Sequence, residues 1–375
     1  MSASVSDGQP DPARPPGEIL SEILKYDWNR PVLQSLADGE RRHKEIRAKL
    51  GDAAPGEGQI NATLRVLANL GVVHKGDHKN DPWKVTELGR GTLADLAELD
   101  RLMAEDPDLP IETFNMSVAH PARRYNYWLG GKDNFGADRA SGDRLEAVYP
   151  GMRAGIRAHR QLLRRVVRFM ADELGIRQFL DVGTGLPTAD NTHEVAQAVA
   201  RSSRVVYVDN DPLVLSHARA LLTSSPEGKT AYIDADAREP DTILSSHELQ
   251  STLDLSQPVG LLLAGMLHFI PGKGAAKPVV DRLMSPLAPG SHLFVTHATN
   301  DFQSQAVIDA HEQMRRQGDS DFWMRDKDEV TELFDGLEIL PPGVVPSTKW
   351  RPEPGTPDLD LRVVNIWSAV ARKPH

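Results

Sequence analysis

The chain has no cysteine among its 375 residues. It therefore forms no disulfide bond, binds no metal through thiolates and has no thiol nucleophile. Long apolar runs are missing as well, since none approaches the roughly 18 residues that a membrane span requires. The first residues, MSASVSDGQPDPARPPG, lack the apolar core of a signal peptide. We therefore expect a cytoplasmic protein with no membrane partner.

Basic residues are outnumbered, with 43 Lys and Arg against 53 Asp and Glu, which gives a net charge of −10. Such a charge argues against broad, nonspecific binding of nucleic acid, although it leaves room for a local basic face. The hydrophobic and charged fractions, 40% and 26%, are ordinary for a globular protein. A chain of this length is long enough for two domains, each with its own core.

Changes in composition divide the chain into four parts. The first residues are rich in Pro, Ser, Asp and Gly and have too little apolar content to offset the entropy of ordering. A later stretch with prolines and acids shows no hydrophobic period, which is typical of a linker. The predicted parts are a flexible tail over 1–17, a helical domain with a β-hairpin over 18–103, a linker over 104–119, and an α/β domain over 120–375.

The run QFLDVGTG, residues 178–185, is the motif around which the second domain is organised. It predicts a buried strand that ends at Asp181 and a turn that contains Gly183 and Gly185. Residues 186–200 predict a helix, whose N-terminus would place exposed N–H groups beside the turn and favour a ligand carboxylate or phosphate. The motif predicts a nucleotide-type site. It lacks the third glycine of a dinucleotide fingerprint, which weakens the case for NAD.

Two further predicted strands end in acidic residues. RVVYVDND predicts a buried strand that ends in Asp209 and is followed by Asn210, and TAYIDADAREP carries Asp236 and Ala237 after its apolar residues. An acid after the second strand can accept two hydrogen bonds from a ribose diol. A carboxylate after the third strand can accept from the exocyclic amine of adenine. Together with the glycine turn, these acids predict an adenosine site.

The most distinctive motif in the sequence is HPARRYNYWLGGKDNFGADR, residues 120–139. It resembles the signature of a family of S-adenosylmethionine-dependent methyltransferases of largely uncharacterised substrate, in which a YDYLLGGKDNF-type segment precedes the nucleotide-binding fold. Asn126 and Trp128 stand where that family usually has Asp and Leu. The resemblance implies a Rossmann-like class I methyltransferase fold of seven strands, mostly parallel, with helices on both faces and the last strand reversed.

The resemblance also implies S-adenosyl-L-methionine as cofactor and a role for each motif residue. Glycines of the turn would let the backbone approach the methionine part, with Asp181 accepting from its ammonium group. Asp209 would hold the ribose, Asp236 with the Ala237 backbone would read the adenine, and the aromatic signature segment would close over the ligands. The implied cofactor-binding residues are Tyr125, Lys132, Asn134, Asp181, Gly183, Thr184, Gly185, Asp209, Asn210, Asp236, Ala237 and Met266, with Tyr127 beside them.

Two histidines are candidates for a general base. PVGLLLAGMLHFIPG and SHLFVTHATND predict the fourth and fifth strands, with His268 and His297 at their carboxyl ends. Ligands of open α/β sheets bind at that edge. A base is needed only if the acceptor arrives protonated, and the ordinary pKa of histidine suits that task near neutral pH. No pair of histidines has metal-site spacing with a clear carboxylate partner, so we predict no metal.

Other polar and aromatic residues have ordinary structural explanations. Residues 156–174 predict an amphipathic helix whose arginines, Arg160 among them, are expected on a solvated face. Phe322 and Trp323 lie between two predicted helices. They are compatible with a substrate pocket, but we expect them to pack on the sheet.

The N-terminal domain resembles a winged helix-turn-helix. Ile60, Leu64 and Leu67 have helical spacing, Gly71 suits the helix end, and two short strands with a polar tip follow. This pattern is similar to winged-helix regulators and equally to the dimerisation domain ahead of many small-molecule O-methyltransferases. Because residues 59–70 offer one basic side chain, we favour a homodimer module over DNA binding.

The sequence thus predicts an S-adenosylmethionine-dependent methyltransferase that acts on an unidentified, small-molecule acceptor. Two alternatives stay open at this point. The first is a winged-helix transcriptional regulator whose non-catalytic methyltransferase domain senses S-adenosylmethionine, with Lys75, Lys79 and Lys84 on its wing. The second is an NAD-dependent dehydrogenase.

Overall fold

The computed structural model describes residues 16–51, 54–78, 80–105, 115, 116, 118–221 and 224–374. The chain divides into two compact units: Met1–Ala119 with Lys132–Ala140, and His120–Gly131 with Ser141–His375. Most of the predicted tail and most of the predicted linker lie outside the described residues. Their ends differ from the prediction, since the first helix begins at Pro16 and the last helix before the linker ends at Glu105.

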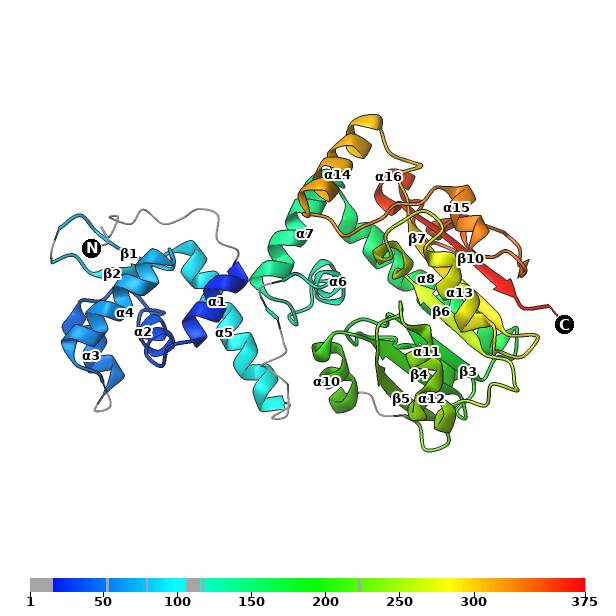
Figure 1. The fold of residues 1–375 in the computed structure, drawn as a ribbon, viewed down its shortest axis with the longest axis horizontal. Helices are drawn as coiled ribbons and strands as arrows, with labels where there is room; N and C mark the ends of the chain where they lie inside the picture. The colour runs from blue at the N-terminus through cyan, green and yellow to red at the C-terminus, as the bar shows by residue number, and fades with distance from the viewer. Residues whose placement is uncertain are drawn as a thin grey trace, which may run out of the picture. The chain divides into compact units, whose positions relative to one another are not determined.

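Helices and one hairpin form the first unit (Figure 1). Apolar residues at helical spacing are buried, among them Ile19, Ile23, Ile60, Leu64 and Leu67. The positive φ of Gly71, 73°, ends the fourth helix as the sequence predicts. The elements are α1 (Pro16–Leu24), α2 (Asn29–Ser35), α3 (His43–Leu50), α4 (Glu57–Asn69), β1 (Val73–Lys75), β2 (Trp83–Val85) and α5 (Glu87–Glu105).

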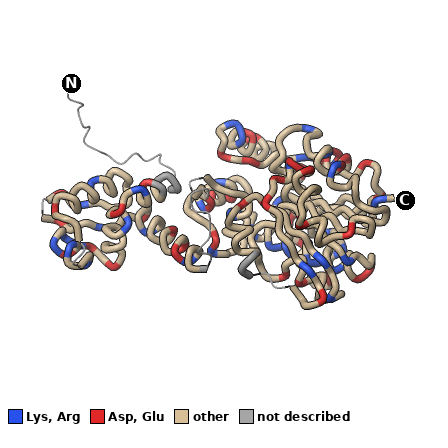
Figure 2. The backbone as a smooth tube through the Cα atoms, turned by 60° about the horizontal axis from the view of Figure 1, so that its bottom comes forward, with Lys and Arg blue, Asp and Glu red and all other residues tan. Residues whose placement is uncertain are grey.

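The hairpin has the predicted antiparallel register, with Val73 opposite Val85, and Arg41 adds an isolated bridge to Trp83. Lys84 forms an ion pair with Glu40, 2.6 Å apart. In Figure 2, Lys and Arg residues are interspersed with Asp and Glu along both units.

A mixed sheet of eight strands forms the centre of the second unit. The order is β5-β4-β3-β6-β7-β10-β8, with β9 paired to β10. The first five strands of this order are parallel, and β10 runs antiparallel to β7. The strands are β3 (Gln178–Val182), β4 (Arg204–Asp209), β5 (Lys229–Asp234), β6 (Gly260–Ala264), β7 (His292–Ala298), β8 (Glu338–Ile339), β9 (Val345–Pro346) and β10 (Ile366–Arg372).

Alternate residues of each strand pack into different cores, because successive side chains point to opposite faces of a sheet. Leu180 packs with residues of the helices α11, α12, α13 and α15, whereas Phe179 packs with residues of α8 and α9. The helices of this unit are α6 (Pro121–Leu129), α8 (Met152–Asp172), α9 (Thr192–Val199), α10 (Pro212–Leu221), α11 (Pro240–Ser245), α12 (His247–Thr252), η1 (Leu267–Phe269), α13 (Ala276–Met284), α14 (Gln305–Gln317), α15 (Lys327–Glu332), η2 (Ser347–Lys349) and α16 (Leu361–Val364). Helix α7 (Gly136–Val148) begins in the first unit and ends in the second.

The predicted number of strands in this sheet needs correction. Eight strands replace the expected seven because β8 and β9 are separate short strands on the same side of β10. Pro341 and Pro342 lie between them, and proline has no N–H with which to continue a ladder.

The helix expected over 186–200 begins only at Thr192. Asn191 and Glu194 form a capping box there, which fixes the start of α9 seven residues beyond Gly185. The glycine turn therefore does not lie at a helix N-terminus, and the predicted helix-dipole contribution to the site is wrong.

Within the described residues, no helix combines the length and the apolar character that crossing a bilayer requires.

Candidate active site

A cavity of about 410 Å³ lies at the carboxyl edge of the parallel strands, and every residue that lines it belongs to the second unit. The order of the strands determines which residues line each part of the cavity. Residues that follow β3, β4 and β5 line one part, which we call the strand-end half: Gly183, Thr184, Gly185, Asp209, Asn210, Asp236 and Ala237. Residues of α6, η1 and the segment before α15 line the other part, the aromatic half: Arg124, Trp128, His268, Phe269, Ile270, Asp321 and Phe322.

The glycine turn after β3 takes a backbone conformation that other residues rarely adopt. Gly183 and Gly185 have φ values of 73° and 68°. A Cβ on Gly183 would lie 2.7 Å from the Cβ of Met266, whereas a Cβ on Gly185 would meet nothing within 4 Å. Gly183 is therefore required both by its conformation and by the close approach of Met266, which also lines the cavity.

Asp209 connects the ends of β3 and β4. Its Oδ2 accepts a hydrogen bond of 2.8 Å from the N–H of Gly185, and its Oδ1 accepts one from the N–H of Asp211. The side chain is buried, and burial raises the pKa of Asp209 despite the opposing effects of His120 and these N–H groups. Each carboxylate oxygen still has capacity to accept from a ligand hydroxyl group.

Asp236 lies after β5 and is held in one orientation by Arg238. The guanidinium Nε of Arg238 lies 2.9 Å and 3.0 Å from the two carboxylate oxygens, and Asn210 Nδ2 donates to Oδ2. The hydrogen bond from Arg238 lowers the pKa of Asp236, so this carboxyl group is ionised at neutral pH.

The distinctive signature segment forms α6, with Gly130 at its C-terminal end in the left-handed conformation. Five residues of α6 line the cavity: Pro121, Ala122, Arg124, Tyr125 and Trp128. His120, just before the helix, lies 3.0 Å from Asp211, the residue whose carboxylate accepts from the first turn of α10. Burial lowers the pKa of His120, but the hydrogen bond and charge of Asp211 raise it more.

A chain of polar groups runs behind the cavity from α6 to β7. Tyr125 Oη lies 2.9 Å from His159 Nδ1, and His159 Nε2 lies 2.8 Å from Thr296 Oγ1. Burial and then the charge of Arg160 lower the pKa of His159 to about 4, so the ring is neutral. Because both of its nitrogens have partners, His159 fixes the orientation of the Tyr125 hydroxyl.

The aromatic half contains a cluster of rings around His268. The His268 ring centroid lies 4.3 Å from that of Phe269 and 4.9 Å from that of Phe322. Its Nδ1 has no hydrogen-bond partner among the described residues. Burial, followed by the charges of His297, His159, Arg124 and Arg325, lowers the pKa of His268 well below its ordinary value. The imidazole is therefore neutral.

His297, the second predicted base, does not line the cavity. Its Nδ1 lies 2.7 Å from the carbonyl oxygen of Ala298, and its Nε2 lies 2.8 Å from Nη1 of Arg325. Arg325 is buried and also donates to the carbonyl oxygens of Leu267, Ile270 and Gly272. The geometry therefore opposes the prediction that His297 is a base, because Nδ1 is hydrogen-bonded to Ala298 and Nε2 to Arg325.

The structure brings together nine of the twelve predicted cofactor residues around the cavity, together with His268. Three lie elsewhere. Lys132 and Asn134 belong to the first unit, where Lys132 is exposed and Asn134 Oδ1 accepts from Arg139. Asp181 is buried behind the turn, where its Oδ2 accepts a hydrogen bond of 2.6 Å from Thr192. The carboxylate of Asp181 thus connects β3 to the start of α9. Tyr127, named beside them, also lies outside the cavity lining and donates to Asp143.

Four notable cavity residues were not predicted as site residues. Arg160 was expected on a solvated face, yet it lines the cavity and donates to the carbonyl oxygens of Ala189 and Asp190. Arg124 and Asp321 form a bidentate ion pair, with Nη2 2.6 Å from both carboxylate oxygens. Helical periodicity gave no signal for these residues, since 197 positions separate Arg124 from Asp321. Phe322, expected to pack on the sheet, lines the cavity and packs with Trp128 and Leu145.

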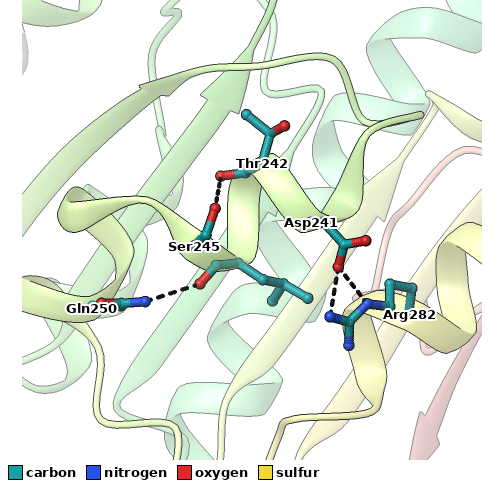
Figure 3. A pocket seen from close by; sticks show the side chains of 6 residues that line it. Asp241, Thr242, Ser245, Gln250 and Arg282 are labelled. Atoms are coloured by element: carbon teal, nitrogen blue, oxygen red, sulfur yellow. Dashed lines mark hydrogen bonds and ion pairs between the residues drawn. The ribbon is translucent and has the colours of Figure 1, made fainter.

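A second hollow, of about 460 Å³, lies over α11, α12 and α13 (Figure 3). Its polar groups bond to one another: Asp241 pairs with Arg282, Ser245 donates to Thr242, and Gln250 donates to the carbonyl oxygen of Leu244. The cavity at the carboxyl edge of the sheet is the better candidate for an active site, because it combines glycines with positive φ, the buried carboxylate of Asp209 and a histidine whose Nδ1 has no partner in the part of the chain that the structure describes.

Comparison with known proteins identifies the class of this unit. Residues 108–374 match the model of the S-adenosyl methyltransferase family. The fold is similar to a DUF574 family protein from Streptomyces avermitilis MA-4680, with 43% identity over 70% of this chain and all of that one, and a TM-score of 0.66. It is also similar to a proposed methyltransferase from Thermobifida fusca YX, with 41% identity over 72% of this chain and all of that one, and a TM-score of 0.65. No curated protein matches.

The chain therefore belongs to the S-adenosyl methyltransferase family, and it is an S-adenosylmethionine-dependent methyltransferase with the class I fold. This conclusion confirms the predicted enzyme class and cofactor. Family membership selects the methyltransferase over the NAD-dependent dehydrogenase, and it gives no support to the alternative of a transcriptional regulator.

Proposed function

We propose that the strand-end half of the cavity binds S-adenosylmethionine and that a small-molecule acceptor enters the aromatic half. One observation carries this proposal: the glycine turn after β3, Asp209 after β4 and Asp236 after β5 line the same cavity as His268. Ligands of open α/β sheets bind beyond the carboxyl ends of the strands, which is where these residues lie.

The residues of the strand-end half suit the chemical groups of this cofactor. The absence of a side chain at Gly183 leaves the backbone open to close approach. The buried Asp209 carboxylate can accept from ribose hydroxyl groups, and the ionised Asp236 can accept from an adenine amine. Arg160 provides a guanidinium group for the cofactor carboxylate, because its side chain reaches the cavity beside the turn.

Calorimetric titration of Asp209→Asn with S-adenosylmethionine tests the assignment of the ribose site. We expect affinity to fall by about 1 to 3 kcal/mol, as is typical when a buried polar group loses its partner. Asp234→Asn is the matched control, since Asp234 ends the neighbouring strand β5 with an exposed side chain outside the cavity. Equal affinity of the two variants would contradict the assignment.

Within this site, His268 is proposed as the residue that accepts a proton from the acceptor. When bound, S-adenosylmethionine supplies a methyl group activated by its sulfonium. The chain contributes mainly by holding the acceptor atom in line at about 3 Å and by excluding water. A neutral imidazole beside that atom can take the proton as the new bond to carbon forms.

The variant His268→Gln tests this role. We expect turnover to fall by about 10²-fold or more, the range for loss of a general base, with cofactor affinity unchanged. The measurement is transfer of tritiated methyl from S-adenosylmethionine into a low-molecular-weight metabolite extract. His292→Gln is the control, because His292 is equally buried but lies at the start of β7, on the opposite edge of the sheet. Normal turnover of His268→Gln would contradict the proposal that His268 acts as the general base.

The first unit is proposed to be a winged-helix module that forms a homodimer. Helices α2 to α4 followed by the β1–β2 hairpin have the order of that motif. Tyr26 is 52% exposed and Leu88 is 38% exposed, so both apolar side chains are accessible to a second copy. Sedimentation equilibrium of the full chain should give the mass of two 41.3 kDa copies. The variant Tyr26→Lys should shift the measured mass toward that of one copy. A monomeric parent protein would contradict the proposal.

A further inference from the structure

The aromatic half presents flat apolar surfaces contributed by three separate segments. Trp128 comes from α6, Phe269 from η1 and Phe322 from the segment before α15. The Phe269 and Phe322 ring centroids lie 5.3 Å apart at an interplanar angle of 60°, and Trp128 packs in the same cluster. Rings arranged edge to face favour a planar aromatic ligand over a saturated one of the same size.

The charges in this half cancel. Arg124, with 4% of its side chain exposed, is paired in a bidentate geometry with Asp321, whose side chain is 40% exposed. His268, the next ionisable group in this half, is held neutral by its surroundings. A ligand with its own charge would enter this half without a counter-charge, which carries a large desolvation cost.

His268 requires a hydrogen-bond partner that this chain does not supply. The residue is 8% exposed, lines the cavity, and has an Nδ1 without a partner among the described residues. Buried polar groups in native proteins are nearly always hydrogen-bonded. Nδ1 itself is closed off from the cavity, so a ligand in the aromatic half can donate only to the other ring nitrogen, Nε2, to which no described residue is hydrogen-bonded.

We infer that the methyl acceptor is an uncharged, planar aromatic molecule with a hydroxyl group that donates to His268. A hydroxyl fits better than an alkylamine, because an alkylamine is protonated at neutral pH and would bring a charge. This inference rests on the proposed function, since it assigns the acceptor to the half of the cavity that the cofactor leaves open.

The reaction that follows is an O-methylation whose atoms and charges balance. The acceptor oxygen forms a bond to the methyl carbon as the bond between that carbon and sulfur breaks, and the sulfonium becomes a neutral thioether. The hydroxyl proton passes to the His268 imidazole and from there to water. No oxidant or further reactant is needed.

Calorimetry with four probes tests the substrate class. The full-length protein, saturated with S-adenosylhomocysteine to prevent turnover, is titrated with 2-naphthol, 2-naphthoate, 2-naphthylmethylammonium and 2-decalol. We expect 2-naphthol to bind about tenfold or more tightly than the two charged probes, which lack a counter-charge, and more tightly than the saturated alcohol. Tighter binding of either charged probe, or equal binding of 2-decalol, would overturn the inference.

Two variants sharpen the test. Asp321→Asn leaves the cation of Arg124 without its partner, so the preference should change from 2-naphthol to 2-naphthoate; an unchanged preference contradicts the charge argument. Phe322→Leu should weaken 2-naphthol binding several-fold. Trp323→Leu, next in the chain but outside the cavity lining, should not.

The same titrations separate this inference from the proposed function. Binding of S-adenosylhomocysteine without binding of any naphthyl probe overturns the acceptor class and leaves the cofactor site intact. Failure to bind S-adenosylhomocysteine overturns the proposed function itself.

Discussion

The two halves of the cavity differ in how they handle charge. The strand-end half keeps carboxylates and a guanidinium facing the cavity, with Asp209 held by the N–H groups of Gly185 and Asp211 and with Asp236 held by that of Arg238. The aromatic half pairs Arg124, the cation that lines it, with Asp321 and surrounds a neutral His268 with rings. One half is built to meet a polar ligand that carries charges, and the other to meet an apolar one.

The halves also differ in what holds them in place. The strand-end half is fixed by parallel strand pairing and by short loops whose side chains bond to nearby backbone. The aromatic half depends on Arg325, which donates to the carbonyl oxygens of Leu267, Ile270 and Gly272 around η1. We therefore expect a single substitution to disturb the aromatic half much more easily.

Among the proposed substitutions, replacement of Arg325 should lower the free energy of unfolding the most. Arg325→Met leaves three buried carbonyl oxygens and His297 without their donor, so the free energy of unfolding should fall by about 3 to 5 kcal/mol. Urea denaturation measures it. Arg315→Met is the control, because Arg315 pairs with Glu312 and contacts Trp323 at the surface, where such pairs contribute about 1 kcal/mol or less. Similar losses in both variants would show that Arg325 does not hold η1.

A matched pair of glycine substitutions tests the strand-end half. Both Gly183→Ala and Gly185→Ala force a side chain into positive φ, at about 1 to 2 kcal/mol each. Gly183→Ala adds a Cβ only 2.7 Å from that of Met266, which should cost a further 1 kcal/mol or so in overpacking. Denaturation curves of the two variants should therefore differ, with Gly183→Ala the less stable. The opposite order contradicts the packing of Met266 on the turn.

Two buried groups beside the cavity, His297 and Asp181, should change the free energy of unfolding in opposite directions as the pH falls. Burial, with Arg325, lowers the pKa of His297 to about 3, and an unfolded histidine titrates near 6.5. Below pH 6.5 the unfolded chain binds a proton that the native chain does not, so the free energy of unfolding falls as pH falls. Burial raises the pKa of Asp181 from 3.8 to about 6. Between those values the native chain binds the extra proton, and stability rises as pH falls.

Denaturation of two variants between pH 4 and 7 separates these contributions. Relative to the parent protein, His297→Gln should lose less stability in acid, and Asp181→Asn should lose more. Each change in slope should be about 1 kcal/mol per pH unit or less. Changes of the same sign in both variants would contradict the assigned protonation states.

The strand-end half was predictable because its determinants are local. An apolar strand, a glycine turn and an acid at the strand end are short patterns, and the parallel order of β3, β4 and β5 brings them to one edge. The late start of α9 was missed because the helical pattern over 186–200 does not show that Asn191 and Glu194 cap the helix at Thr192.

The aromatic half was not predictable in the same way. Phe322 and Asp321 reach the cavity through contacts with α6, and the sequence contains no sign that Arg124 would pair with Asp321. The sequence predicts equivalent positions for His268 and His297 at the ends of two strands, whereas in the structure His297 lies within β7 and His268 lies in η1. The two histidines also differ because Arg325, which is distant in the sequence, is hydrogen-bonded to Nε2 of His297.

Hydrogen exchange with and without S-adenosylmethionine tests the central claim most directly. Cofactor binding at the three strand ends predicts slower amide exchange in residues 183–186, 209–211 and 236–238 together, with little change in α11 and α13 around the second hollow. Protection that omits any of these three loops, or that appears only around that hollow, would contradict a cofactor site at the carboxyl ends of β3, β4 and β5.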